Sequence, residues 1–206
     1  MIANALSNLN VGRVGRIYTA APLVFTFDDF GSRSESPIGT PYESVGANTV
    51  HLAGGFAVGD GGAAEFRVRT SWGAFNPNQR ATIDLGTTTS GVAASVRVAS
   101  NGDCYYAYMN STTSIGVWKR YAGGSFAQID PGGTPGITAL VPNDKYSLEA
   151  TGAGPVTLIV RKNGGAALFT ITDDGASYGG AVLTTGQIGA LLNSGQSISG
   201  FGGEDI

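Results

Sequence analysis

The sequence predicts an all-β protein folded as an antiparallel sandwich or barrel. From Val24 onward, apolar side chains alternate with polar ones with a period of two rather than 3.6, as expected for half-buried strands. Turn signals separate these short runs, and Asn163-Gly164 is a strong hairpin signal. The 206 residues include 33 Gly and only 13% charged residues, which disfavours long surface helices. Repeated short strands of this spacing are typical of sandwiches and barrels.

Residues 1–23 differ in composition from residues 24–206. Their only charged residues are Arg13 and Arg16, so this segment carries +2 and the rest of the chain −5 of the net −3. We interpret residues 1–23 as an extended arm that anchors the protein; the alternative is a floppy N-terminus. The arm residues expected to make contacts are Leu6, Leu9, Val11, Arg13, Val14, Arg16, Ile17 and Tyr18.

The strands expected in residues 24–206 follow from this alternation. In the first clear example, Phe66, Val68, Thr70 and Trp72 alternate with more polar neighbours. Residues 184–193 fit either a short capped helix or a Gly-interrupted strand, because so few residues do not define a period. The expected strands are 65–72, 80–85, 92–98, 104–109, 115–121, 146–150, 156–162 and 167–172, with turns at 101–103, 123–124, 131–133 and 163–164.

The order of these segments resembles a known family. The segments that carry the resemblance are Phe27-Asp28-Asp29-Phe30-Gly31, Pro37-Ile38-Gly39 with Tyr42, residues 91–98 and residues 101–108. They are similar to concanavalin A-like (laminin G-like) jelly-roll domains of bacterial and bacteriophage proteins, although Tyr42 replaces the usual Trp. The resemblance implies an antiparallel β-sandwich over residues 24–206.

Enzymes of this superfamily that cleave glycans carry closely spaced acidic residues, as Glu-x-Asp-x-x-Glu, on one strand. Such spacing directs two carboxylates at one glycosidic bond. Here Glu occurs only at 35, 43, 65, 149 and 204, and no two lie within six positions. We therefore expect no catalytic residues and no enzymatic activity. We interpret His51 as structural and Cys104 as a small core residue.

We also expect no metal and no cofactor. The sequence contains no Asp-x-Asp-x-Asp-Gly calcium loop. A dispersed calcium site using Asp28, Asp60 or Asp103 stays open, although a turn-capping role for these residues is favoured.

The weakly acidic net charge gives no basic surface of the kind that binds nucleic acid, so we expect no nucleic-acid partner. Without an apolar run of 18 residues, we expect no membrane insertion. No secretory signal is evident.

Exposed aromatic side chains are the remaining candidates for binding, because sugars stack on aromatic faces. Tyr105 and Trp118 are opposite in phase to Val117 and Tyr106, so we select Tyr105 and Trp118 as candidate glycan-stacking residues.

The sequence leads to one main functional hypothesis and two alternatives. In the main hypothesis the protein is a bacteriophage virion subunit, such as a capsid decoration, head-fibre or tail-associated protein. It would be made in the host cytoplasm, and its arm would dock onto capsid or tail proteins or onto sister subunits of a homo-oligomer. Its jelly roll would face the exterior, where many copies could bind cell-surface glycans weakly. The alternative is a free carbohydrate-binding module or lectin, and a glycan-degrading enzyme is least favoured.

Overall fold

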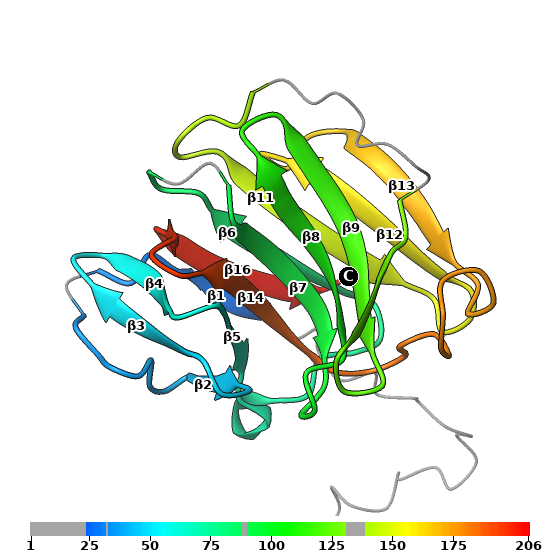
Figure 1. Ribbon diagram of the computed structural model, residues 1–206, viewed down its shortest axis with the longest axis horizontal. Coiled ribbons are helices and arrows are strands. Elements are labelled where there is room, and N and C mark those ends of the chain that lie inside the picture. The colour runs from blue at the N-terminus through cyan, green and yellow to red at the C-terminus, as the bar shows by residue number, and fades with distance from the viewer. Residues whose placement is uncertain (1–23, 32, 88–89, 131–138) are drawn as a thin grey trace, which may run out of the picture.

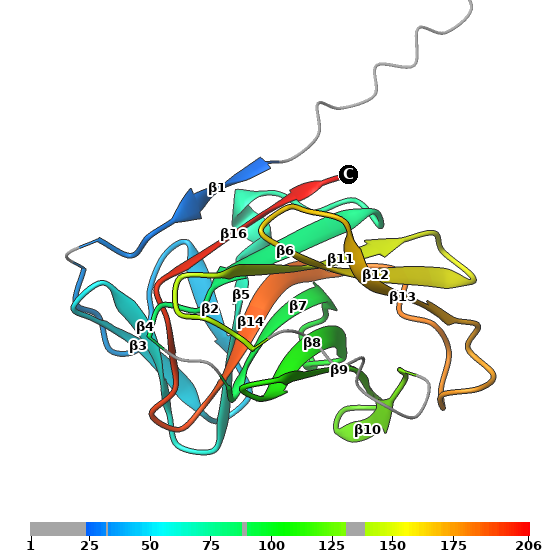
Figure 2. The same cartoon turned by 90° about the horizontal axis from the view of Figure 1, so that it is seen from above.

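A computed structural model describes residues 24–31, 33–87, 90–130 and 139–206. These residues form three antiparallel sheets, two of which stack as the layers of a sandwich (Figures 1 and 2). The predicted all-β jelly roll is therefore confirmed. The predicted arm over residues 1–23, with all its candidate contact residues, and the predicted turn at 131–133 lie outside the described residues.

One layer of the sandwich is a six-stranded sheet with the order β1-β16-β6-β11-β12-β13. Its hairpins pair sequence neighbours, such as β11 with β12, whereas β16 returns from the C-terminal end of the chain to lie between β1 and β6. The strands are β1 (Val24–Asp28), β6 (Gln79–Asp84), β11 (Lys145–Thr151), β12 (Val156–Lys162), β13 (Ala167–Asp173) and β16 (Gly200–Asp205).

The other layer is a seven-stranded sheet with the order β10-β9-β8-β7-β14-β5-β2. Strand β14 crosses over from the C-terminal part of the chain and separates β7 from β5. The strands are β2 (Tyr42–Val45), β5 (Ala63–Val68), β7 (Val92–Val98), β8 (Cys104–Ser111), β9 (Ser114–Tyr121), β10 (Ser125–Gln128) and β14 (Gln187–Asn193).

A small three-stranded sheet, β15-β4-β3, flanks the sandwich at one end (Figure 2). Its strands are β3 (Thr49–Ala53), β4 (Phe56–Asp60) and β15 (Ser197–Ile198), and a 3-10 turn covers Thr70–Trp72. No helix among the described residues has the length and apolar character needed to cross a bilayer.

The main hydrophobic core lies between the two large sheets. At its centre, the ring of Tyr42 lies edge-on to Phe66, and Phe66 lies edge-on to Phe201, with centroid distances of 4.9 and 5.1 Å. Edge-to-face aromatic pairs of this kind stabilise a core beyond the area they bury. Tyr42, which stands where the resembling family has Trp, is thus a buried core residue.

Three local expectations can be compared with the fold. At the predicted 163–164 turn, Asn163 and Gly164 both have positive φ, and the amide of Gly165 donates to the carbonyl of Lys162, as a type I′ hairpin requires. Of the two alternatives for residues 184–193, the strand is confirmed: β14 begins at Gln187 and continues to Asn193. The expected strand 65–72 is too long, because β5 ends at Val68 and Trp72 lies in the 3-10 turn, 55% exposed.

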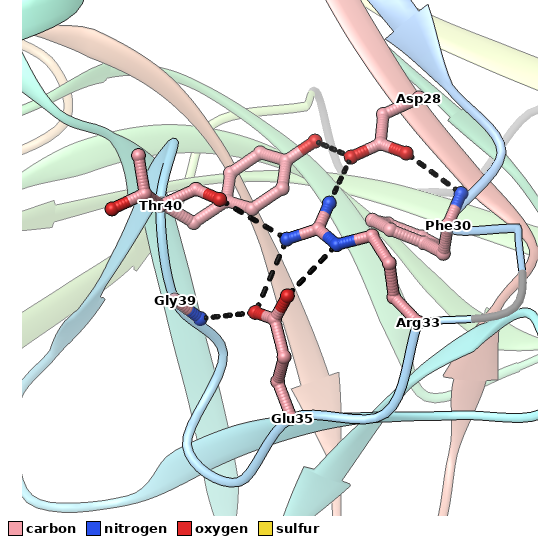
Figure 3. A network of polar contacts seen from close by, with 7 residues as sticks. Asp28, Phe30, Arg33, Glu35, Gly39 and Thr40 are labelled. Carbon is pink, nitrogen blue, oxygen red and sulfur yellow. Dashed lines mark hydrogen bonds and ion pairs between the residues drawn. The ribbon is translucent and has the colours of Figure 1, made fainter.

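A polar network built around Arg33 organises the loop between β1 and β2 (Figure 3). The guanidinium of Arg33 contacts Asp28 at 2.7 Å and Glu35 at 2.9 Å, and also donates to the carbonyl of Thr40. The hydroxyl of Tyr42 donates to the Asp28 carboxylate at 2.9 Å. Asp28, in the motif that carries the resemblance, thus connects the Phe30 amide and the Arg33 guanidinium to the hydroxyl of the core aromatic Tyr42.

Candidate binding groove

The outer face of the seven-stranded sheet carries a second hydrophobic cluster, separate from the main core. On β8, Tyr105 and Ala107 belong to the main core, whereas Cys104 and Tyr106 belong to the outer cluster. Tyr108 and Trp118 are half-buried and pack against the outer cluster. Alternation along β8 and β9 therefore places Tyr106, Tyr108 and Trp118 on the face directed away from the other sheet.

These aromatic side chains line a hollow of about 280 Å³. The ring of Phe126 on edge strand β10 is 54% exposed and lies edge-on to Tyr106, with ring centroids 6.4 Å apart. The ring of Tyr108 meets Tyr106 in the same geometry at 6.4 Å. The hollow is lined by Ala63, Tyr106, Tyr108, Asn110, Trp118, Arg120, Phe126, Leu191 and Asn193.

A second hollow, of about 460 Å³, adjoins the aromatic one. The two share the lining residues Tyr108, Asn110 and Asn193, so they lie side by side, and we refer to them together as the groove, with an aromatic compartment and a polar compartment. The amide of Asn193 donates to the hydroxyl of Tyr108 at 2.6 Å, which fixes the wall between the compartments. The remaining lining residues of the polar compartment are Gly62, Ser90, Gly91, Ser194 and Gln196.

The absence of a side chain at Gly116 gives room to the groove residues above it. A Cβ atom at this position would lie 2.7 Å from Trp118 Nε1 and 2.8 Å from Asn110 Nδ2. Trp118 Nε1 is itself buried, and it has no hydrogen-bond partner in the described part of the chain. This indole N–H therefore lies below the surface of the groove with its hydrogen bond unmet, which is costly for a buried polar group.

A buried ion pair lies beneath the aromatic compartment. Arg120 donates to the carboxylate of Glu65 and to the carbonyl of Gly102. Burial raises the pKa of Glu65 above its ordinary value, in spite of the nearby Arg120 cation. The thiol of Cys104 lies 3.5 Å from Glu65 Oε1 and is fully buried, so Cys104 is a core residue as predicted. Arg120 thus lines the groove with its guanidinium already paired to Glu65.

The prediction that Tyr105 is a surface stacking residue is wrong. Tyr105 is fully buried between the sheets, and its hydroxyl donates to Asp173 at 2.6 Å. Asp173 also pairs with Lys119 at 2.9 Å, and the side chains of both ions are fully buried. Trp118, the other predicted stacking residue, does line the groove. The two residues lie on opposite faces because Tyr105 pairs with Lys119 and Tyr106 pairs with Trp118.

The other polar residues selected from the sequence serve local structure. His51 Nδ1 lies 2.7 Å from Asp60 Oδ1 on the neighbouring strand. Asp103 accepts from Asn101 and from the amide of Gly123, and Asp28 belongs to the Arg33 network. Each of the three candidate calcium ligands is therefore engaged by protein donors. The described residues hold no group of three or more metal-ligating side chains.

A third hollow, of about 490 Å³, lies instead on the outer face of the six-stranded sheet. Its arginines form ion pairs across neighbouring strands. Glu149 accepts from both Arg80 and Arg161 at 2.7 Å, and Arg80 also contacts Glu204. Because these charges are satisfied within the sheet, they offer little to a ligand. The aromatic groove is the stronger candidate site.

Most of the groove residues were missed by the sequence-based selection. The alternation along β8 correctly separates Tyr106 and Tyr108 from Tyr105. The error was to select the face of Tyr105, which is buried, as the exposed face of the strand. Phe126 lies on a strand of only four residues. Asn193 reaches the groove through the crossover of β14, a long-range pairing for which the sequence carries no local signal.

Comparison with solved structures shows the same fold at low sequence identity. A carbohydrate-binding module, CBM66, from Bacillus subtilis matches with a TM-score of 0.55 and 14% identity, over 77% of this chain and 91% of that one. A legume lectin-like domain from Entamoeba histolytica matches with a TM-score of 0.45 and 11% identity, over 85% and 97% of the two chains. A tail fiber protein from a phage of E. coli matches with a TM-score of 0.37 and 12% identity, over 70% of this chain and 15% of that one. The last two scores are too low to carry an argument.

Searches by sequence found no such likeness. No protein-family model matches the chain, and no curated protein matches it. The similarity to solved structures therefore supports the jelly-roll fold, and the functional argument depends on the groove.

Proposed function

We propose that this protein is a carbohydrate-binding module that holds a glycan in the groove on the outer face of its seven-stranded sheet. The observation that carries the proposal is the aromatic compartment, in which Tyr106, Trp118 and Phe126 surround one hollow. The apolar C–H faces of sugar rings stack on such aromatic faces, while amide groups at the rim bond to their hydroxyls.

We propose binding without cleavage. Glycoside hydrolysis generally needs two carboxyl groups on either side of the scissile bond. Neither described hollow of the groove includes an Asp or Glu among its lining residues. Glu65, the carboxylate beneath the aromatic compartment, lies below the surface in its pair with Arg120.

A glycan array tests this proposal. We expect the full chain to bind a subset of glycans, and Phe126→Ala to weaken that binding about two- to tenfold, the range of one aromatic stacking contact. Trp72→Ala is the matched control, because Trp72 and Phe126 are almost equally exposed but Trp72 lies outside the groove. A blank array, or equal losses for the two variants, would contradict the proposal.

We further propose that the module is displayed on a bacteriophage particle and is anchored by residues 1–23. Support comes from the sequence: the arm has spaced apolar residues, two arginines and no acidic residue, and the family resemblance includes phage proteins. Arms of this kind dock through backbone pairing and apolar anchors. A free lectin with the same groove is the alternative.

Deleting residues 2–21 separates display from free binding. If the arm is the anchor, the shortened chain keeps its glycan affinity but no longer joins particles or oligomers in sedimentation. If the shortened chain assembles as the full chain does, the anchoring role is wrong and the free module is favoured.

A further inference from the structure

We propose that the groove binds an internal stretch of a neutral polysaccharide, with at least one sugar ring in each compartment, rather than a single terminal sugar. This inference depends on the proposed function and adds to it the class of ligand. It follows from the residues that the two hollows share, from the charge of their lining and from an amide at their boundary.

The shape of the groove favours a chain. Small-molecule sites have volumes of roughly 300–1,000 Å³. The aromatic compartment, at about 280 Å³, is just below this range, and the polar compartment adds about 460 Å³ beside it. A single ring stacked on Trp118 would leave the polar compartment open. A chain that crosses the shared wall at Tyr108 and Asn193 would fill both.

The lining favours neutral sugars. The polar groups in the second compartment are amides and hydroxyls, supplied by Asn110, Asn193, Gln196 and two serines. Arg120, the one cation among the described lining residues of the groove, is paired with buried Glu65. A uronate or sulfate group would therefore lose its hydration without gaining a free counter-charge, whereas a neutral hydroxyl would find both donors and acceptors.

A shared amide indicates where a sugar oxygen belongs. Asn110 lines both hollows, so its amide lies at the boundary between the compartments. The N–H donors of this amide are suited to an acceptor oxygen, such as a ring or glycosidic oxygen of the bound chain. A glycosidic oxygen at this boundary would join the rings of the two compartments.

Titration calorimetry with oligosaccharides of increasing length tests the inference. The probes are manno-, xylo- and cello-oligosaccharides from one to four rings, with oligogalacturonides of the same lengths as the acidic set. We expect affinity for one neutral series to rise at least about tenfold between one and three rings, and each acidic probe to bind more weakly than its neutral counterpart. Equal affinity for one and three rings, or preference for the acidic set, would overturn the inference and leave the proposed function standing. No binding to any probe, joined with a blank glycan array, would overturn both.

Single-residue variants test which compartment provides the gain in affinity with oligosaccharide length. Gln196→Ala removes an amide of the polar compartment, so it should reduce the gain in affinity between one and three rings about three- to tenfold. Phe126→Ala should weaken every length alike. Thr170→Ala, exposed on β13 of the other sheet, is the control and should change neither. A length dependence that survives Gln196→Ala in full would place the second ring elsewhere and contradict the two-compartment groove.

Discussion

The thiol of Cys104 lies beneath the groove, packed in the outer cluster with Tyr106. Burial raises the pKa of Cys104 well above its ordinary value, and the neighbouring Glu65 adds to this effect. Because the reactive species is the thiolate, we expect alkylation of the native protein to be more than about a hundredfold slower than in denaturant. Mass spectrometry after timed treatment with iodoacetamide measures the ratio. Rapid native labelling would mean that the outer cluster opens easily.

The Glu35 carboxylate should make the loop between β1 and β2 sensitive to acid. Hydrogen bonds from Arg33 hold the pKa of Glu35 below its ordinary value. As pH falls, the unfolded chain takes up this proton first, so stability is present above the ordinary Glu pKa of about 4.3 and is lost through the lowered folded value. For this partly exposed pair, we expect Glu35→Gln to cost less than about 1 kcal/mol at neutral pH and nothing in strong acid. Thermal unfolding of both proteins across this pH range measures the difference, and a pH-independent difference would contradict the assignment.

Individual side chains also show where sequence reasoning reached its limit. Alternation on β8 separated Tyr105 from Tyr106 correctly, but both faces of the strand are covered, so the pattern did not reveal which face belongs to the main core. Lys119 made it harder to assign the faces of β9, because a charged residue faces the core only when a partner such as Asp173 pairs with it. That partner lies on a distant strand and could not be identified from the sequence.

At the scale of elements, the pair Lys119–Asp173 joins β9 of one sheet to β13 of the other. Tyr105 from β8 adds its hydroxyl to the same carboxylate, and Lys119 also donates to the carbonyl of Gly180 in the loop before β14. Four segments therefore meet at one buried charge pair. Elsewhere the facing sheets meet largely through apolar side chains.

Breaking this pair should be costly. Lys119→Met leaves the Asp173 charge buried without its cation, and we expect a loss of about 3–5 kcal/mol in the free energy of unfolding. Adding Asp173→Asn removes that stranded charge and keeps an acceptor for Tyr105, so the double variant should be more stable than Lys119→Met alone. Urea denaturation of the single and double variants measures both values. Additive losses would show that the two residues act independently.

The floor of the groove on β9 offers a second test. In Gly116→Ala the new methyl group would displace Trp118 or Asn110, because both lie within 2.8 Å of its position. We expect glycan affinity to fall about tenfold, with a stability loss of about 1–3 kcal/mol from overpacking. Calorimetry and urea denaturation on the same sample separate the two effects. Unchanged affinity would remove Trp118 from the binding surface.

Elements with strong local signals were predictable, and those that depend on long-range pairing were not. The hairpin at Asn163-Gly164 follows from two residues that tolerate positive φ. Strand β14 has no such signal, and it becomes a strand because β5 and β7 pair with it on both sides. The groove depends on this crossover, so the location of its polar compartment was not contained in any local pattern.

Considered as a whole, the described part of the molecule should unfold as one cooperative unit. The main core includes residues from both large sheets and from the three-stranded sheet, such as Phe66, Leu148 and Leu52. We expect the fluorescence of Trp118, measured in a Trp72→Phe background, to change at the same urea concentration as far-UV circular dichroism. A lower midpoint for fluorescence would mean that the seven-stranded layer separates first.

The position of β1 determines how the module can be held. Val24 pairs with Glu204, so both ends of the described chain leave from one edge of the six-stranded layer, as Figure 2 shows. The groove opens on the opposite layer. A tether at either end, whether a particle, a fusion partner or a sensor chip, therefore attaches away from the groove and leaves the proposed binding face accessible to a large, insoluble polysaccharide.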